Sequence, residues 1–151
     1  MDTTKQVSVF LENRPGKLAN VLLALAREKV NVVALTIMDS HEHSVLRLVT
    51  SDLPQTLQVL DGLNASHTES EVLMVELRNQ PGALAHVCEQ LAAAHINIEY
   101  AYCSSGGKNG KVSGVFKVSN IQKATQALSN GAANNNRRIE PRLPRNLKVG
   151  K

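Results

Sequence analysis

The chain of 151 residues contains no tryptophan, only two phenylalanines and only two tyrosines, so that aromatic residues make up 3% of it. Its core must therefore be aliphatic, and any sheet surface lacks the aromatic platform on which single-stranded RNA bases stack, which argues against a nucleic-acid partner. The two cysteines, Cys88 and Cys103, show no Cys-x-x-Cys spacing. We expect both to be free thiols in a reducing cytoplasm.

Long apolar runs are also missing. No run approaches the ~20 residues that a membrane-spanning helix needs, and residues Met1–Gln6 lack the apolar stretch of a secretion signal. We therefore expect a soluble, cytoplasmic protein without a membrane partner. His41-Glu42-His43 beside Asp39 offers no third or fourth metal ligand, and we interpret this segment as a solvated hairpin tip. No nucleophile–base pair or carboxylate pair emerges, so neither an enzymatic activity nor a cofactor is expected.

The formal net charge of +4 comes from one end of the chain. From Arg137 onward there are six basic residues and one acidic residue, which leaves 11 basic and 12 acidic residues for the body. The body is thus close to neutral, and the basic segment 142–151 is interpreted as a flexible tail. An anion-binding arm or a dock for an acidic partner is the alternative interpretation of this tail.

The pattern Asn-x-Pro-Gly-x-Leu-Ala occurs twice, beginning at Asn13 and at Asn79. A further asparagine follows each copy after 18 residues, at Asn31 and at Asn97. Aligning residues 7–32 with residues 73–98 gives 11 identities in 26 positions without a gap. The chain is therefore a tandem repeat, and the fold must be built from two similar units.

The first repeat is predicted to form a strand, a helix, two strands, a helix and a final strand. Alternating apolar residues predict strands, and apolar residues spaced three and four apart predict the inner face of a helix. The predicted elements are a strand at 7–11, a helix with Pro15 in its first turn and Leu18, Val21, Leu22 and Leu25 inward, strands at 31–38 and 44–50, a helix capped by Asp52 with Leu53, Leu57 and Leu60 inward, and a weak edge strand at 66–71.

The second repeat follows the same order. Its predicted elements are a strand at 73–77, a helix with Leu84, Val87, Cys88 and Leu91 inward, a strand at 96–103, a glycine-rich hairpin turn at 104–110, a strand at 112–118, a helix capped by Asn120 with Ile121, Ala124, Thr125 and Leu128 inward, a polar turn or linker at 130–136 and a short strand at 138–142. We expect one domain over residues 5–71 and a second over residues 72–141.

This order of elements is the ferredoxin-like β-α-β-β-α-β pattern, an α+β fold with an antiparallel sheet and both helices on one face. Two such units most simply build an eight-stranded sheet or two packed sheets. Tyr100 and Tyr102 share a strand face with Ile98. Three interpretations are open: they pack in the ordinary way, they lie at the interface of the repeats, or they lie beside a ligand.

The strand, the Asn-x-Pro-Gly-x-Leu loop, the helix and the downstream Asn-(Ile/Val) resemble the ACT domain, a small regulatory module that binds amino acids. The resemblance covers both repeats, about residues 6–130. It implies that two such domains pair and hold a ligand between them. The ligand-binding residues that it implies are Asn13, Pro15, Gly16, Lys17, Leu18 and Asn31 in the first repeat, and Asn79, Pro81, Gly82, Ala83, Leu84 and Asn97 in the second.

The loop chemistry also suits an amino acid. A helix N-terminus offers free N–H groups to a carboxylate, glycine lets a ligand approach the backbone, and asparagine can accept or donate. The alternative is that Asn13 and Asn79 merely cap the helices and that Asn31 and Asn97 are turn residues. The first loop, with Arg14 and Lys17, has the more favourable field for a carboxylate.

ACT domains that sense serine carry a histidine two positions before the first asparagine, where this chain has Leu11 and Leu77. This departure favours an apolar or branched-chain ligand. The sequence therefore predicts a stand-alone amino-acid-binding regulatory protein that forms a homodimer. The alternative is a regulatory subunit of an amino-acid biosynthetic enzyme, since residues 12–19 also resemble the start of the small subunit of acetolactate synthase.

Overall fold

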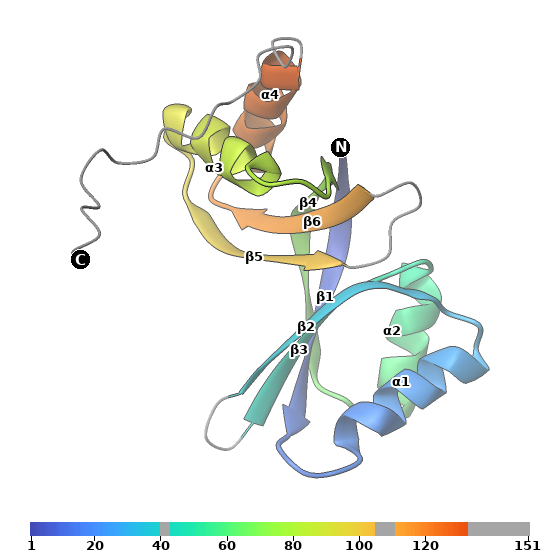
Figure 1. The fold of residues 1–151 in the computed structure, drawn as a ribbon. Coiled ribbons are helices and arrows are strands. Elements are labelled where there is room, and N and C mark those ends of the chain that lie inside the picture. The colour runs from blue at the N-terminus through green and yellow to red at the C-terminus, as the bar shows by residue number, and fades with distance from the viewer. Residues whose placement is uncertain (40–42, 105–110, 133–151) are drawn as a thin grey trace, which may run out of the picture.

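The computed structural model describes residues 1–39, 43–104 and 111–132. Its elements are β1 (Asp2–Glu12), α1 (Lys17–Arg27), β2 (Val32–Asp39), β3 (His43–Thr50), α2 (Leu53–Gly62), β4 (His67–Arg78), α3 (Ala83–Ala93), β5 (Ile98–Ser104), β6 (Lys111–Val118) and α4 (Ile121–Ala132). Figure 1 shows α1 and α2 at one end of a curved sheet and α3 and α4 at the other. The predicted α+β fold of two ferredoxin-like units is confirmed.

One six-stranded antiparallel sheet, in the order β2-β3-β1-β4-β6-β5, joins the two units. The expected eight-stranded sheet or pair of packed sheets is not what these strands form. The two units share strands: β4 is the last strand of the first unit and the first strand of the second, and β1 occupies the fourth-strand position of the second unit. The predicted strand at 138–142 lies outside the described residues.

Strand β4 corrects the prediction of a weak edge strand at 66–71. It runs without interruption from His67 to Arg78 and lies in the middle of the sheet, between β1 and β6. The reason is that β1 begins already at Asp2, and its first eight residues pair with β4 from His67 to Met74. Backbone groups that would be exposed at an edge are therefore hydrogen-bonded.

The β1–β4 pairing places an approximate two-fold axis inside the chain. Equivalent positions of the two repeats differ by 66 residues, and the partners in every β1–β4 pair have numbers that add to 76. Lys5 and Glu71 are thus equivalent to each other and also directly opposite each other. The axis passes between them, and their opposite charges favour this register.

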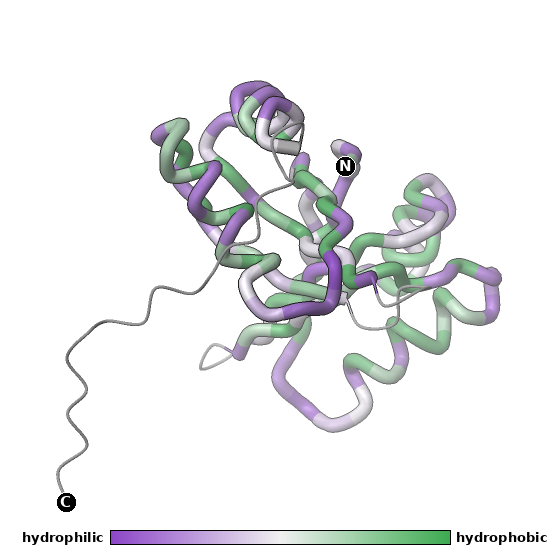
Figure 2. Tube along the Cα trace, turned by 45° about the horizontal axis from the view of Figure 1, so that its top comes forward, coloured by the Kyte–Doolittle hydropathy of each residue, from purple (hydrophilic) through white to green (hydrophobic). Residues whose placement is uncertain are grey.

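Each unit has its own aliphatic core between the sheet and its helices. The first core includes Val9, Leu25 and Leu48, and the second includes Leu91 and Phe116, all of them fully buried. Figure 2 shows hydrophobic and hydrophilic residues alternating along the helices, as such one-sided packing requires. Leu84 departs from the prediction: it is 45% exposed, because it lies in the first turn of α3 at the rim of the second core.

The two cores fill equivalent space with different residues. Leu46 and Leu48 of β3 correspond to Gly114 and Phe116 of β6, two positions that the register of the sheet makes equivalent. A Cβ atom at Gly114 would lie 2.7 Å from Cε2 of Phe116. The phenylalanine ring therefore occupies the room that a leucine side chain fills in the first unit.

The helix caps and termini agree in part with the predictions. Asp52 accepts a hydrogen bond from the Gln55 amide at 3.0 Å, and Asn120 accepts one from the Lys123 amide at 2.9 Å, so both predicted caps are confirmed. Helix α4 continues to Ala132, so residues 130–132, expected in a turn or linker, are helical. The glycine-rich segment 105–110, most of the hairpin tip at 40–42 and the tail lie outside the described residues.

Candidate functional site

The two Asn-x-Pro-Gly segments adopt the same turn. The amide of Lys17 donates to the carbonyl of Arg14 at 3.3 Å, and Gly16 has φ of 87° and ψ of −15°. The second loop repeats this, with Ala83 donating to the Gln80 carbonyl at 3.3 Å and Gly82 at 85° and −13°. These are type II turns, in which proline fits the second position and the left-handed third position favours glycine.

Because of this turn, the expected place of Pro15 is wrong, and so is the alternative in which the loop asparagines cap the helices. Pro15 does not lie in the first turn of α1, since the left-handed Gly16 is the N-cap and the helix begins at Lys17. Asn13 and Asn79 do not cap the helices, because neither α1 nor α3 has a side-chain cap. Helices α2 and α4 do have one. The two loop helices thus leave their positive N-terminal ends open to an anion.

The asparagines at the start of the loops lie in different surroundings. The amide of Asn13 donates to Oδ1 of Asp39, the last residue of β2, at 2.9 Å. The position equivalent to Asp39 in the second repeat is residue 105, which lies outside the described residues. Asn79 lines a cavity of about 160 Å³ together with Ala83, Leu84 and Cys103. The second loop therefore has a small cavity at the predicted residues.

Asn31 and Asn97 have equivalent roles in the backbone. The amide of Asn31 donates to Oγ of Ser51 at 3.0 Å, and the amide of Asn97 donates to Oγ of Ser119 at 3.2 Å. Both asparagines are exposed. Asn31 directly precedes β2, whereas Asn13 is hydrogen-bonded to Asp39 at the other end of this strand. Because β2 has eight residues, the two asparagines lie roughly 25 Å apart. One unit does not bring its own pair of asparagines together.

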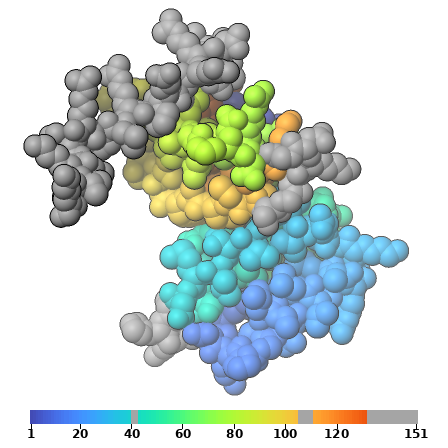
Figure 3. Space-filling view, viewed as in Figure 1, coloured from blue at the N-terminus to red at the C-terminus, as the bar shows by residue number. Residues whose placement is uncertain are grey.

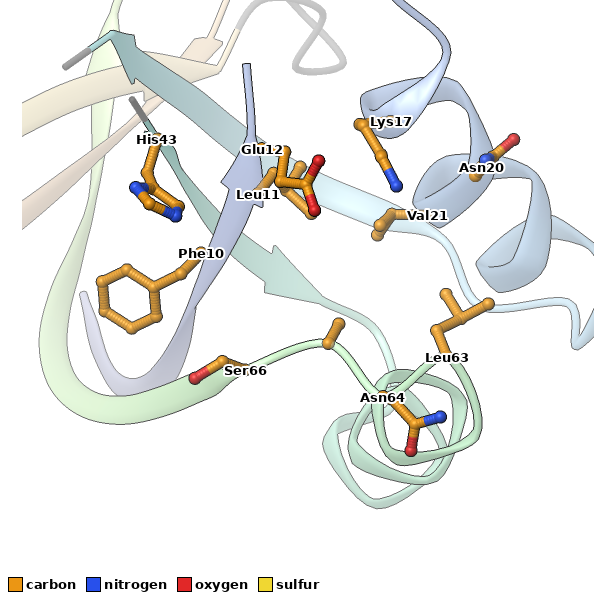
Figure 4. A pocket seen from close by; sticks show the side chains of 11 residues that line it. Phe10, Leu11, Glu12, Lys17, Asn20, Val21, His43, Leu63, Asn64 and Ser66 are labelled. Atoms are coloured by element: carbon orange, nitrogen blue, oxygen red, sulfur yellow. The ribbon is translucent and has the colours of Figure 1, made fainter. Parts of the chain in front are cut away.

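A larger cavity of about 490 Å³ lies below the first loop, between β1, α1 and the connection from α2 to β4. Lys17 and Glu12 point toward this space, and Leu63 and Asn64 line it on the side of the connection (Figure 4). Of the predicted ligand-binding residues, only Lys17 lines it. The sequence does not indicate Asn64 and Ser66 as lining residues, because it is a long-range hydrogen bond, from the amide of Phe10 in β1 to the carbonyl of Ser66 at 2.9 Å, that holds this connection beside β1.

Charge is arranged differently around the two loops. Arg14 forms an ion pair with Glu12, which offsets part of the positive charge expected at the first loop. The residue equivalent to Glu12 in the second repeat is Arg78, which lines the smaller cavity. Next to it, Lys111 donates to Glu76 at 2.7 Å, and this hydrogen bond lowers the pKa of the Glu76 carboxyl below its ordinary value.

No group of three or more metal-ligating side chains occurs within residues 1–39, 43–104 and 111–132. None of the helices in these ranges is both long and apolar enough to cross a membrane. Cys88 and Cys103 are free thiols, as predicted.

Two β-α-β-β-α-β units, each with a Pro-Gly turn before an uncapped helix, define a tandem pair of ferredoxin-like modules. The family model described as "ACT domain pair" matches residues 2–134, and the chain belongs to this family. The resemblance stated from the sequence is thereby confirmed. No curated protein sequence matches the chain.

Solved structures agree with this assignment. Protein BT0572 from Bacteroides thetaiotaomicron is 32% identical, with a TM-score of 0.80 over 86% of this chain and 89% of that one. The regulatory subunit of aspartate kinase from Thermus thermophilus, in its ligand-free form, is 15% identical, with a TM-score of 0.62 over 86% of this chain and 97% of that one. Its counterpart from Thermus flavus is 18% identical, with a TM-score of 0.59 over 87% and 94%. The two Thermus proteins share the fold.

Proposed function

We propose that the protein is an amino-acid-binding regulatory protein that uses its Asn-x-Pro-Gly loops as ligand sites. The observation that carries the proposal is the contrast among the four helices of the described residues. α2 and α4 are closed by Asp52 and Asn120, whereas α1 and α3, which follow the two loops, have no side-chain cap. An amino acid's carboxylate is the kind of group that fits such an open N-terminus.

The loop supplies the remaining contacts. An added Cβ at Gly16 or Gly82 would meet no atom within 4 Å, so the space beside each glycine is open to a ligand. In the second loop, Arg78 adds positive charge and Asn79 an amide at the same cavity. Leu77 and Leu84 line this cavity too, which supports an apolar or branched-chain side chain on the ligand and argues against serine.

At the first loop, a site that contains both asparagines requires a second copy of the chain. Asn13 and Asn31 lie at opposite ends of β2, which is an edge strand. If β2 pairs antiparallel with β2 of a second copy, the end of one strand meets the start of the other. The Asn13 loop of one copy then lies beside Asn31 of its partner. We propose a homodimer of this kind, with the ligand held between the copies.

The surface of the first unit supports this pairing. Leu35 and Ile37 of β2 are 40% and 44% exposed, and Val33 is 38% exposed. An unprotected apolar edge strand tends to associate with another strand. The equivalent positions on β5, the other edge, are Glu99, Ala101 and Cys103. The backbones of the two edge strands are arranged in the same way. The fold therefore does not require apolar side chains at these positions, and only β2 carries a row of them.

The regulated partner is proposed to be an amino-acid biosynthetic enzyme. Proteins of the same fold from two Thermus species are described as regulatory subunits of aspartate kinase. Ligand binding would favour one arrangement of the paired units and so change the affinity for the enzyme, a coupling of typically ~1–3 kcal/mol. Acetolactate synthase is the alternative partner that the loop sequence at residues 12–19 suggests.

A thermal-shift screen against the twenty amino acids tests ligand binding. A ligand at 100 times its dissociation constant stabilises the folded state by roughly 2.7 kcal/mol. Asn13→Ala should remove the part of this stabilisation that comes from the first loop, and Asn79→Ala the part that comes from the second. Asn130→Ala, on the exposed side of α4, should leave it unchanged. The proposal is wrong if no amino acid raises the melting temperature of the full chain.

Light scattering after gel filtration tests the dimer. Leu35→Glu places a charge on the β2 edge and should give a monomer. Ala101→Glu places a charge at the equivalent position of β5, and the molar mass measured for this variant should remain that of a dimer. Equal effects of the two substitutions, or a monomeric wild-type protein with and without its ligand, would contradict pairing through β2.

A further inference from the structure

A fully buried glutamine lies where the two repeats meet. Gln6 of β1 donates from Nε2 to the hydroxyl of Tyr100 at 2.9 Å and to Oγ of Ser8 at 3.2 Å. The hydroxyl of Tyr102 donates to its Oε1 at 2.9 Å. Both N–H groups and the carbonyl of the amide thus have partners, which a buried amide needs to avoid a large desolvation cost. We call Gln6, Tyr100 and Tyr102 the inner clamp.

The inner clamp exists only because the sheet curls. Strands β1 and β5 are separated by β4 and β6 in the sheet, so in a flat sheet their backbones would lie about 14 Å apart. Their side chains meet across the concave face instead, where β2 and β5, the two edges, also approach each other. Figure 3 shows the second repeat directly above the first in this region. The clamp therefore links β1 of the first unit to β5 of the second across the concave face.

Contacts lead from the inner clamp to the first loop. The guanidinium of Arg47 lies over the ring of Tyr100, 4.1 Å from its centroid, and its Nη1 contacts Sδ of Met38 at 3.0 Å. The next residue along β2 is Asp39, whose carboxylate holds Asn13. Arg47, Met38 and Asp39 thus form a continuous chain of contacts between Tyr100 and the Asn13 loop.

The clamp also borders the second loop. Cys103 follows Tyr102 in β5 and lines the cavity of about 160 Å³ beside Asn79. Successive residues of a strand share its backbone, so a group that enters this cavity and displaces β5 also moves the Tyr102 hydroxyl. The inner clamp therefore lies between the two Asn-x-Pro-Gly loops.

The approximate two-fold symmetry shows that the fold does not require this polar cluster. The positions equivalent to Gln6, Ser8 and Arg47 are Val72, Met74 and Val115, and those equivalent to Tyr100 and Tyr102 are Ala34 and Thr36. Ala34, Val72 and Val115 form an apolar cluster on the same concave face. At the equivalent positions, the same concave face is thus packed with apolar side chains. A buried polar network in its place selects one geometry, because its hydrogen bonds fail when the strands shift.

We infer that the inner clamp couples the two Asn-x-Pro-Gly loops, so that occupation of the Asn79 cavity changes the Asn13 loop of the same chain. Gln6 is a positioning residue in this device, since it acts through Tyr100 and Tyr102. The biological meaning of the coupling rests on the proposed amino-acid binding. The coupling itself is a property of the fold and can be tested without a ligand.

The test uses the exposed thiol of Cys103 as a handle. In a Cys88→Ala background, iodoacetamide alkylates Cys103 and fills the Asn79 cavity. Hydrogen exchange of residues 12–18 is then compared between alkylated and free protein. Tyrosine fluorescence is a second readout, because the chain has no tryptophan and its only two tyrosines belong to the clamp. We expect a change in fluorescence and a several-fold change in exchange at the first loop.

The matched variant is Gln6→Val, which introduces the residue found at the equivalent position of the second repeat. In this variant alkylation should still occur, but the change in exchange at residues 12–18 should disappear. Asn120→Ala, which removes the cap of α4 without touching the clamp, should retain the full change. If Gln6→Val does not fold, Tyr102→Phe removes a single hydroxyl and serves the same comparison.

Two results would overturn the inference. One is that alkylation changes hydrogen exchange at residues 12–18 equally in the Gln6→Val variant and in the protein that retains Gln6. The other is that alkylation changes neither this exchange nor the tyrosine fluorescence in the protein that retains Gln6. Neither result depends on the amino-acid screen. Failure of that screen with intact coupling would instead remove the proposed ligand and leave the device in place.

Discussion

At the scale of single residues, two glycines decide how each loop is built. Gly16 and Gly82 adopt left-handed φ values of 87° and 85° and end the preceding turn one residue before the helix. Proline before each glycine fixes the other corner of the turn. The sequence shows the Pro-Gly pair, and local propensity alone predicts that Pro15 lies in the first turn of the helix. The left-handed conformation moves Pro15 and Pro81 outside the helices and leaves the helix ends open.

Replacing either loop glycine by alanine should destabilise the protein. A left-handed conformation costs an L-residue roughly 1–2 kcal/mol, so Gly16→Ala and Gly82→Ala should each lower the free energy of unfolding by about 1 kcal/mol. Urea unfolding measures this. Gly62→Ala is the control, because Gly62 ends α2 with open space around it and no positive φ. It should stabilise the protein by about 0.5 kcal/mol. Equal effects at all three positions would contradict the assigned turn.

Tyr102 should make stability depend on alkaline pH. Burial raises the pKa of its hydroxyl well above the ordinary value, and the neighbouring Tyr100 raises it further. Its contribution to stability is complete below the unfolded pKa of about 10 and is lost as the pH rises toward the folded pKa, because the unfolded chain releases the proton first. Above pH ~10, the ionisation of Tyr102 in the unfolded chain should lower the free energy of unfolding by about 1.4 kcal/mol per pH unit.

Urea unfolding between neutral pH and the start of alkaline denaturation measures the slope. Tyr102→Phe should show a shallower decline above pH ~10 than the wild-type chain. Slopes are compared, because the substitution also removes a hydrogen bond to Gln6 at every pH. Identical slopes would mean that Tyr102 ionises equally easily in both states.

At the scale of elements, most helices and strands follow from local patterns. Alternating apolar residues in Val7–Leu11 and the helical spacing of Leu18, Val21 and Leu25 specify their elements without reference to the rest of the chain. Strand β4 does not follow in this way. Its first half, His67–Glu71, is polar, and only pairing with β1 makes it a central strand. Local pattern specifies an element's type, whereas its neighbours in a sheet come from distant residues.

The capped and uncapped helices should respond differently to loss of a polar side chain. Asp52→Ala and Asn120→Ala each remove a hydrogen bond to the helix N-terminus and should cost about 1 kcal/mol at neutral pH. Asn79→Ala should change stability by no more than about 0.5 kcal/mol, because Asn79 is exposed and does not cap α3. Thermal unfolding without ligand measures all three. A loss at Asn79 as large as at Asp52 would restore the capping interpretation.

At the scale of the whole molecule, the two units cannot be separated. Each takes its fourth strand from the other, and the shared β1–β4 pair lies on the approximate two-fold axis between Lys5 and Glu71. Two cores of similar size therefore depend on the same central strands. This interdependence predicts a single cooperative unfolding transition despite the tandem repeat.

Leu25→Ala and Leu91→Ala test this prediction at equivalent, fully buried positions in the two cores. Each should cost about 2–5 kcal/mol, since it leaves a cavity. Both should lower the midpoint of one and the same transition, as followed by circular dichroism in urea. Leu23→Ala, at a side chain that is 56% exposed, should have little effect. Two separate transitions in either variant would show that the units unfold independently.

The sequence by itself determined the repeat, the ferredoxin-like units, the ACT family and the loops, because these depend on short residue patterns and on their recurrence 66 positions along the chain. Only the tertiary structure decided that the units share β1 and β4, that Asn13 and Asn31 lie apart, and that Gln6 is buried between Tyr100 and Tyr102. These features depend on the curl of a six-stranded sheet and on contacts between residues almost a hundred positions apart. No local pattern in the chain carries that information.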